Sequence, residues 1–208
     1  PNTEFVISFD LDVITMYEAY DRTERIAWGL EQAKSEELTE HEKRVYELSQ
    51  IEPGMPKVMP YQIGFRLLTT LLQTYSGDID AVIKSLGDVK PEQEACLRRR
   101  CECAWYWVRD CAPDDFRFAL REDGSKADLT PVEADCMKKI YTDVLPKMND
   151  VDEKALSQLI FDVATGAGIQ PKQLFVAAYK ALVNKEAGPR LAGFFKIIGK
   201  EKLEKILK

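Results

Sequence analysis

Residues 91–113, PEQEACLRRRCECAWYWVRDCAP, decide the fold class. Pro91 stands where the first turn of a helix tolerates a residue without an N–H group, and Pro113 stops the segment. No glycine or other proline lies between them. The stretch therefore predicts one long helix that ends near Cys111.

Helical patterns continue on both sides of this segment. The residues before it carry an apolar stripe at helical spacing, formed by Phe65, Leu68, Leu72 and Tyr75. Gly87 is a predicted helix C-cap, and Thr130 with Glu133 forms a predicted capping box. Pro171 and the pair Gly188-Pro189 mark further helix boundaries. We count eight or nine predicted helices in all.

The N-terminal part begins differently. Phe5, Ile7 and Phe9 alternate with their neighbours and predict a short extended stub before the first helix. Thr39 and Glu42 form a predicted capping box for a second helix. Residues 52–60, EPGMPKVMP, carry three prolines and a glycine and predict a linker. We place a domain boundary there, which gives regions 1–60 and 61–208.

The predicted fold class is all-α, a multi-helix bundle or α-helix cage with the extended N-terminal stub. No strand–helix alternation indicates a parallel sheet, and no fixed period indicates a solenoid. The chain has 208 residues, 45% of them hydrophobic and 31% charged, which is typical of a globular protein. No apolar run is long enough to predict a membrane span, and no signal peptide is evident.

Charge is distributed unevenly along the chain. The net charge is −6, which by itself argues against a nucleic-acid partner. Residues 172–208, however, carry nine basic and three acidic side chains. Since salt screens surface charge within about 10 Å, a partner responds to the local patch more than to the total. The basic end therefore keeps an anionic partner open.

The sequence shows no evident catalytic site. His41 is the only histidine and lies in a charged run, and neither a P-loop nor a GxGxxG motif occurs. The five cysteines do not follow a usual zinc spacing, so we expect buried or inert thiols, no bound metal and a reducing cytoplasm.

Two segments combine side chains that suit RNA. In residues 97–118, basic and aromatic side chains are interleaved as a reader of single-stranded loops requires. Arginine pairs with phosphate, and aromatic faces stack on unpaired bases. Near the C-terminus, Gly188-Pro189 would place an arginine at a helix N-terminus, where free N–H groups favour an anion. The candidate tRNA-binding residues are Arg98, Arg99, Arg100, Trp105, Trp107, Arg109, Arg117 and Arg190.

Each segment also has a purely structural interpretation. Trp105 and Trp107 lie on different faces of a helix, so at least one of them is expected in the core. Arg98 and Glu102 have the spacing of an ordinary ion pair. The basic C-terminal end also fits an amphipathic closing helix, with Leu203 buried and its lysines reaching to solvent.

Three segments in the same order resemble class I lysyl-tRNA synthetases: residues 7–26 (ISFDLDVITMYEAYDRTERI), 97–118 (LRRRCECAWYWVRDCAPDDFRF) and 188–195 (GPRLAGFF), the last followed by GKEKLEKIL. The resemblance implies a stem-contact-like helical region at 1–60 and a helical anticodon-binding domain at 61–208. It implies tRNA-Lys as the partner, together with the protein's own upstream catalytic domain. The intact enzyme would use ATP to attach lysine to tRNA, whereas this fragment would hold no cofactor and catalyse nothing alone.

Two alternatives stay open. The chain could be a helical protein–protein interaction scaffold in which the aromatic residues are core and the charges keep it in solution. It could also be a complete small enzyme, although no catalytic motif supports this. The acidic balance of residues 1–171 departs from what an RNA-binding surface needs.

Overall fold

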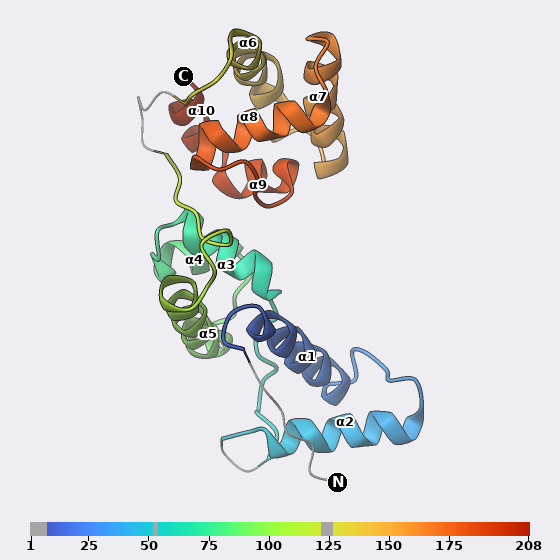
Figure 1. Ribbon diagram of the computed structural model, residues 1–208. Coiled ribbons are helices and arrows are strands. Elements are labelled where there is room, and N and C mark those ends of the chain that lie inside the picture. Colours follow the sequence, from blue (N-terminus) through green and yellow to red (C-terminus); the bar gives the residue numbers. More distant parts are fainter. Residues whose placement is uncertain (1–7, 52–53, 122–126) are drawn as a thin grey trace. The chain divides into compact units, whose positions relative to one another are not determined.

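The computed structural model describes residues 8–51, 54–121 and 127–208, and Figure 1 shows their helices. By its internal contacts the chain divides into two compact units, Pro1–Arg117 and Phe118–Lys208. No strand occurs among the described residues, which confirms the expected all-α class. The expected stub falls mainly on residues 1–7, outside the described residues, and Phe9 lies in a turn. The functional division near residue 60 stays a prediction.

The first unit opens with α1 (Asp12–Ala27) and α2 (Glu36–Leu48), which pack against each other. Ile26 of α1 and Tyr46 of α2 are fully buried. Apolar burial of this kind supplies most of the stability of short helices, because helices of this length are marginal in water by themselves.

The start of α2 differs from the expectation. The Ser35 hydroxyl accepts a hydrogen bond from the Leu38 N–H at 3.2 Å and caps the helix. Thr39 lies inside the first turn, where its hydroxyl donates to the Ser35 carbonyl at 2.9 Å. Glu42 accepts a hydrogen bond from the Thr23 hydroxyl of α1. The capping box predicted at Thr39 was therefore wrong by one turn, because a better-placed serine precedes it.

Three apolar residues of α2 are exposed. Tyr46 is the only buried residue of this helix, whereas Leu38, Val45 and Leu48 are 46%, 41% and 69% exposed. Their spacings of seven and three residues place them on one side of the helix. We call these three residues the α2 apolar stripe.

The rest of the first unit consists of three packed helices, α3 (Phe65–Thr74), α4 (Ile79–Leu86) and α5 (Pro91–Asp110). Gly87 ends α4 with a φ of 77°, as predicted for a C-cap. Pro91 occupies the first turn of α5, also as predicted. The face of α5 that packs inward consists of Leu97, Cys101, Ala104, Trp107 and Val108.

The second unit holds the remaining α-helices: α6 (Pro131–Lys139), α7 (Glu153–Gly166), α8 (Pro171–Val183), α9 (Leu191–Ile198) and α10 (Lys200–Leu207). The predicted capping box is present at α6. The Thr130 N–H donates to the Glu133 carboxylate at 2.8 Å, and the Glu133 N–H donates to the Thr130 hydroxyl at 3.4 Å. A short π-helix (Ile140–Val144) and a short 3₁₀ helix (Leu145–Lys147) follow α6.

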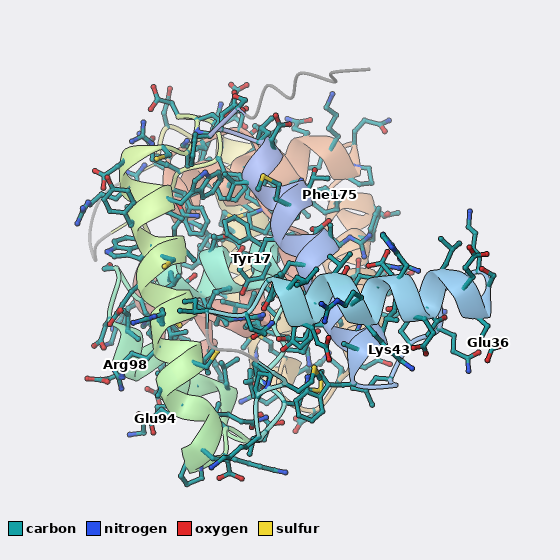
Figure 2. The ribbon with its side chains drawn as sticks, turned by 90° about the horizontal axis from the view of Figure 1, so that it is seen from below. Tyr17, Glu36, Lys43, Glu94, Arg98 and Phe175 are labelled. Atoms are coloured by element: carbon teal, nitrogen blue, oxygen red, sulfur yellow. The ribbon has the colours of Figure 1, made fainter. Side chains whose placement is uncertain are left out.

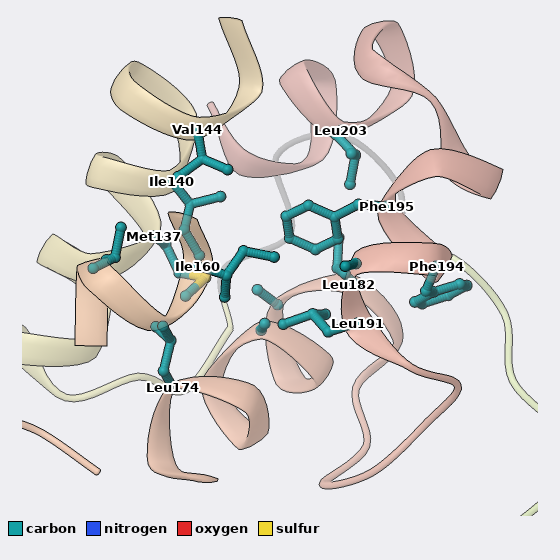
Figure 3. Close-up of a cluster of buried hydrophobic side chains, with 14 of the residues drawn as sticks. Met137, Ile140, Val144, Ile160, Leu174, Leu182, Leu191, Phe194, Phe195 and Leu203 are labelled. Carbon is teal, nitrogen blue, oxygen red and sulfur yellow. The ribbon is translucent and has the colours of Figure 1, made fainter. Parts of the chain in front are cut away.

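Apolar side chains from every helix of the second unit meet in one core (Figure 3). Phe195 and Leu182 are fully buried there. Leu203 of α10 is also fully buried, and Ile206 and Leu207 pack partly against the same core. The basic C-terminal end is therefore the closing amphipathic helix that the sequence suggested. None of the described helices is long and apolar enough to cross a membrane.

Candidate nucleic-acid interface

The candidate residues of the first unit lie along α5 and just after it, and helical geometry separates them. Arg99, Tyr106 and Arg109 follow at spacings of seven and three residues, so they share one face, which is exposed. Trp107 belongs to the buried face. Neighbouring positions in the sequence therefore have different surroundings.

Trp107 belongs to the core. Its side chain is 4% exposed and its ring stands edge-on to those of Phe65 and Phe116, each at a centroid distance of 5.0 Å. The indole N–H donates to the Phe9 carbonyl at 2.8 Å, which satisfies its only donor. Between the two tryptophans, Trp107 is thus the enclosed one.

Trp105 lies partly exposed against a turn. A Cβ atom built on Gly77 would stand 2.4 Å from its ring, so the indole packs directly on that glycine. Gly77 has a φ of +82°, which glycine adopts without the strain that a side chain would add. The α3–α4 turn therefore fixes this ring while leaving part of it accessible.

Arg100 is held inside the first unit. Its guanidinium lies 2.8 Å from Asp21 Oδ1 and 3.3 Å from Glu24 Oε2, and its side chain is only 12% exposed. It also lies 5.2 Å from the centroid of the Tyr17 ring. Burial raises the pKa of Asp21, while the nearby Arg100 charge opposes that shift. The contact joins α5 to α1.

Glu24 completes this buried polar group. Its carboxylate also accepts a hydrogen bond from the Tyr46 hydroxyl at 2.9 Å and another from the Gln62 amide. Burial raises the pKa of Tyr17 to about 12, so Tyr17 stays neutral beside Arg100 near neutral pH. This buried polar group links α1, α2 and α5, so the role of Arg100 is structural.

Arg98 lies on another face of α5, where acids surround it. Its Nη2 lies 2.7 Å from Asp80 Oδ1 and 3.0 Å from Glu94 Oε1. Figure 2 shows Arg98 and Glu94 along the same helix. The two hydrogen bonds hold the pKa of Arg98 above its usual range. The expected partner Glu102 is replaced by Glu94, which stands four residues before Arg98.

Tyr106, Arg109 and Arg117 gather at the end of α5, and we call them the α5-end cluster. The Arg109 guanidinium lies 5.6 Å from the centroid of the Tyr106 ring, and Arg117 Nη1 donates to the Arg109 carbonyl at 3.1 Å. Asp110 pairs with Arg109 at 2.8 Å, and Asp114 pairs with Arg117. The cluster is accessible: Tyr106 is 59% exposed.

Arg99 is exposed, and its side chain forms no hydrogen bond or ion pair among the residues that the structure describes. It stands two helical turns before Tyr106 on the same face of α5. The accessible candidates of the first unit are therefore Arg99 and the α5-end cluster, with Arg98 and Trp105 partly exposed beside them.

In the second unit, Tyr179 fixes the loop that presents Arg190. The Tyr179 hydroxyl donates to the Pro189 carbonyl, and its ring would stand 2.8 Å from a Cβ on Gly188. The Gly188-Pro189 pair therefore lies on the Tyr179 ring, and Arg190 becomes the N-cap of α9. Arg190 is exposed, as expected at a helix start.

Arg190 also lines a pocket of about 510 Å³. One face of α7, the start of α9 and two aromatic residues of α8 form its walls. Phe161 and Phe175, at the pocket, stand edge-to-face with centroids 5.4 Å apart. Sequence reasoning missed both rings. Their sequence signal is weak, because α7 and α8 read as ordinary amphipathic helices and only packing brings these rings together.

No three histidine, cysteine, aspartate or glutamate side chains of the described chain gather as they would around a metal ion. Among the cysteines, Cys101 and Cys136 are buried and the other three are at least partly accessible. Burial raises the pKa of Cys101 to about 11, which keeps that thiol protonated and unreactive.

The sequence matches no protein-family model. It is similar over its whole length to the lysine–tRNA ligase of Treponema pallidum, with 46% identity. It is also similar to the lysine–tRNA ligases of Borreliella burgdorferi (44% identity over 99% of this chain) and Thermococcus kodakarensis (34% over 97%). In each case the chain spans 39% of the relative's own length.

Proposed function

We propose, from the premise that this chain belongs to the lysine–tRNA ligase family, that it is the tRNA-binding part of such an enzyme. The observation that carries the proposal is the similarity of the whole of this chain to proteins of that name. The chain spans about two-fifths of the length of those proteins. Within the described residues every regular element is a helix.

The division of labour follows from this placement. The remaining three-fifths of the polypeptide would bind ATP and lysine and join lysine to tRNA. This chain would hold the tRNA-Lys stem through residues 1–60 and its anticodon loop through residues 61–208. It would work in the cytoplasm beside its own catalytic domain and contribute no reacting group.

The accessible cations support contact with phosphate. Arg99 is exposed and uncommitted among the described residues. In the α5-end cluster the Arg109 guanidinium lies beside the Tyr106 ring, and Arg117 donates to the Arg109 carbonyl. Exposed pairs such as Arg109–Asp110 contribute little by themselves, so a phosphate can replace the carboxylate at small cost. The proposed contacts in the first unit therefore centre on Arg99, Arg109 and Arg117, with Trp105 or Tyr106 as the stacking ring.

Two of the candidate tRNA-binding residues have structural roles. Arg100 neutralises buried carboxylates, and Trp107 fills the core. Our proposal gives them an indirect part, since they hold α5 in the position from which its exposed face meets RNA.

The test is a filter-binding titration of this chain with tRNA-Lys at about 50 and about 200 mM salt. We expect the affinity for tRNA-Lys to fall steeply as the salt concentration rises. Arg109→Ala should weaken binding and reduce the salt slope by about one, as removal of one phosphate contact does. Lys138→Ala on α6, also exposed and also ion-paired but outside the proposed contacts, is the matched control and should change neither. Binding that is absent at low salt, or indifferent to salt, would overturn the proposal.

One observation favours the second candidate function, a helical scaffold for another protein. The α2 apolar stripe is exposed, and exposed apolar faces are characteristic of protein contacts. If this were the main role, Arg99→Ala and Arg109→Ala would leave RNA affinity unchanged, and a Leu48→Ser variant would lose a protein partner instead.

A further inference from the structure

Two accessible thiols lie on the exposed face of α5. Cys96 and Cys103 are both exposed, and their spacing of seven residues places them on the same side of the helix. Arg99 stands between them, three residues after the first and four before the second. It is exposed, and its side chain forms no hydrogen bond or ion pair within the part of the chain that the structure describes. Two thiols therefore flank an uncommitted guanidinium group.

The two thiols cannot form a disulfide with each other. Helix α5 runs unbroken from Pro91 to Asp110, and seven residues of α-helix rise by about 10 Å. A disulfide joins residues whose Cα atoms lie within about 7 Å of each other. Cys111, eight residues beyond Cys103, is farther along the helix axis still, while Cys101 and Cys136 are buried. Oxidation of this face therefore has to join a thiol to another molecule.

The surroundings of the two thiols differ. Cys103 lies one turn after Arg99 and one turn before the α5-end cluster, within the face that we propose for RNA. Glu102 precedes Cys103 directly and, as an adjacent residue on a helix, does not face it. Cys96 lies at the edge of this face, one turn after the exposed Glu92, whose charge disfavours an anionic group there. Cys103 is therefore the better position for an anionic adduct, and Cys96 is its comparison within the same helix.

The side chains of this face suit a small disulfide that carries carboxylates, such as glutathione disulfide. A thiolate attacks disulfide sulfur, and a guanidinium group pairs with a carboxylate through two parallel hydrogen bonds. In the exchange, the Cys103 thiol loses its proton to solvent and its Sγ attacks one sulfur of the small disulfide. The sulfur–sulfur bond of that molecule breaks, a new one forms to Cys103, and the departing thiolate takes up a proton. The small disulfide is thus the oxidant, and one half of it leaves as the reduced thiol.

We propose that Cys103 is a reversible modification site for a carboxylate-bearing small disulfide, and that Arg99 holds a carboxylate of the adduct. The adduct places bulk and negative charge on the exposed face of α5, so it weakens contact with RNA phosphates until a free thiol removes it. In a reducing compartment the adduct persists only while small disulfides accumulate. The effect on RNA rests on the proposed function, whereas the modification itself does not.

Intact-mass spectrometry with peptide mapping follows the reaction of the folded chain with glutathione disulfide. We expect an adduct to form first at Cys103 and more slowly at Cys96, and none to form at Cys101 or Cys136, which are buried. A reaction at Cys103 no faster than that at Cys96, or a disulfide-linked pair of chains in place of the adduct, would overturn the assignment.

The role of Arg99 is tested with a second, uncharged reagent, bis(2-hydroxyethyl) disulfide. Arg99→Ala should slow the reaction of Cys103 with glutathione disulfide roughly threefold, the factor expected of an exposed ion pair, and leave the reaction with the uncharged reagent unchanged. Arg44→Ala removes an exposed cation of α2 and is the matched control, which should slow neither reaction. Equal slowing with both reagents would mean that Arg99 does not pair with the carboxylate, which would remove it from the proposed site.

The effect on RNA is measured by filter binding of tRNA-Lys to the chain before and after the reaction. The adduct should weaken binding about tenfold, as the loss of one charge-assisted contact does, and dithiothreitol should restore it. Cys103→Ser should keep its affinity through the same treatment, whereas Cys96→Ser should lose it. An adduct at Cys103 that leaves the affinity unchanged would refute the effect on RNA.

The outcomes separate the two proposals. If Cys103 is modified as expected but the untreated chain binds no tRNA-Lys, the proposed function fails and the modification site stands. If the untreated chain binds tRNA-Lys and Cys103 stays unmodified, the modification site is wrong and the proposed function stands.

Discussion

Arg98 and Arg100 stand two positions apart on α5, and the structure predicts opposite consequences for their removal. Arg100 is 12% exposed and faces the buried carboxylates of Asp21 and Glu24. Arg100→Ala removes the cation that pairs with both carboxylates, which costs about 3–5 kcal/mol of unfolding free energy. Arg98 is 38% exposed and pairs with exposed acids, so Arg98→Ala should cost about 0.2–1 kcal/mol.

Urea unfolding followed by tryptophan fluorescence measures this difference. All three tryptophans, Trp28, Trp105 and Trp107, belong to the first unit, so the signal reports on that unit alone. With a slope of about 1–3 kcal/mol per molar urea, the midpoint of Arg100→Ala should fall by at least about 1 M.

Arg100→Lys is the informative control, because it keeps the charge and loses the fork that reaches two carboxylates. Its midpoint should fall between those of the unaltered chain and Arg100→Ala. The reasoning is refuted if Arg100→Ala unfolds at the same urea concentration as Arg98→Ala. That result would mean that the buried carboxylates do not depend on this guanidinium.

Three further predictions concern the stability of the first unit. Gly77→Ala and Gly87→Ala both place a side chain at positive φ, but only the first meets a ring, that of Trp105. We therefore expect Gly77→Ala to lose about 1–3 kcal/mol more in urea unfolding, and equal losses would contradict the contact. Ser35→Ala removes the cap of α2 and should cost about 1 kcal/mol in the same assay, whereas no change would place the cap elsewhere. Burial raises the pKa of Asp21 above its usual 3.8, so its carboxyl stabilises the fold at low pH, and this contribution declines as pH rises through the raised pKa. The unaltered chain should accordingly lose stability relative to Asp21→Asn as pH rises from 3.8, and a constant difference over that window would argue against it.

Most of the fold could be predicted from local signals. Pro91 and Gly87 mark helix ends by their backbone constraints and Thr130 by local hydrogen bonds, and the structure confirms all three. The cap predicted at Thr39 was wrong because Ser35, which also carries a hydroxyl, stands four positions earlier and caps α2. The family was also foreseen, since its relatives match the whole chain and not only the three segments that suggested it.

The candidate site was harder to predict because exposure is decided by distant residues. Arg100 looks like its neighbours in the sequence, and only Asp21 and Glu24, far away along the chain, take it inside. Helical spacing in the sequence places Trp105 and Trp107 on different faces of α5, but it does not predict which of the two lies in the core. Phe161 and Phe175 belong to different helices, and nothing local joins them.

The α2 apolar stripe has a practical consequence for anyone handling this chain. Ion-driven contact with RNA weakens as electrolyte is added, whereas contact through Leu38, Val45 and Leu48 strengthens in sulfate, which is excluded from apolar surfaces. The two behaviours therefore diverge in a single titration. If added sulfate makes the protein self-associate while it releases RNA, both surfaces are accessible in that preparation. The same anion then strengthens the apolar contact and weakens the ionic one.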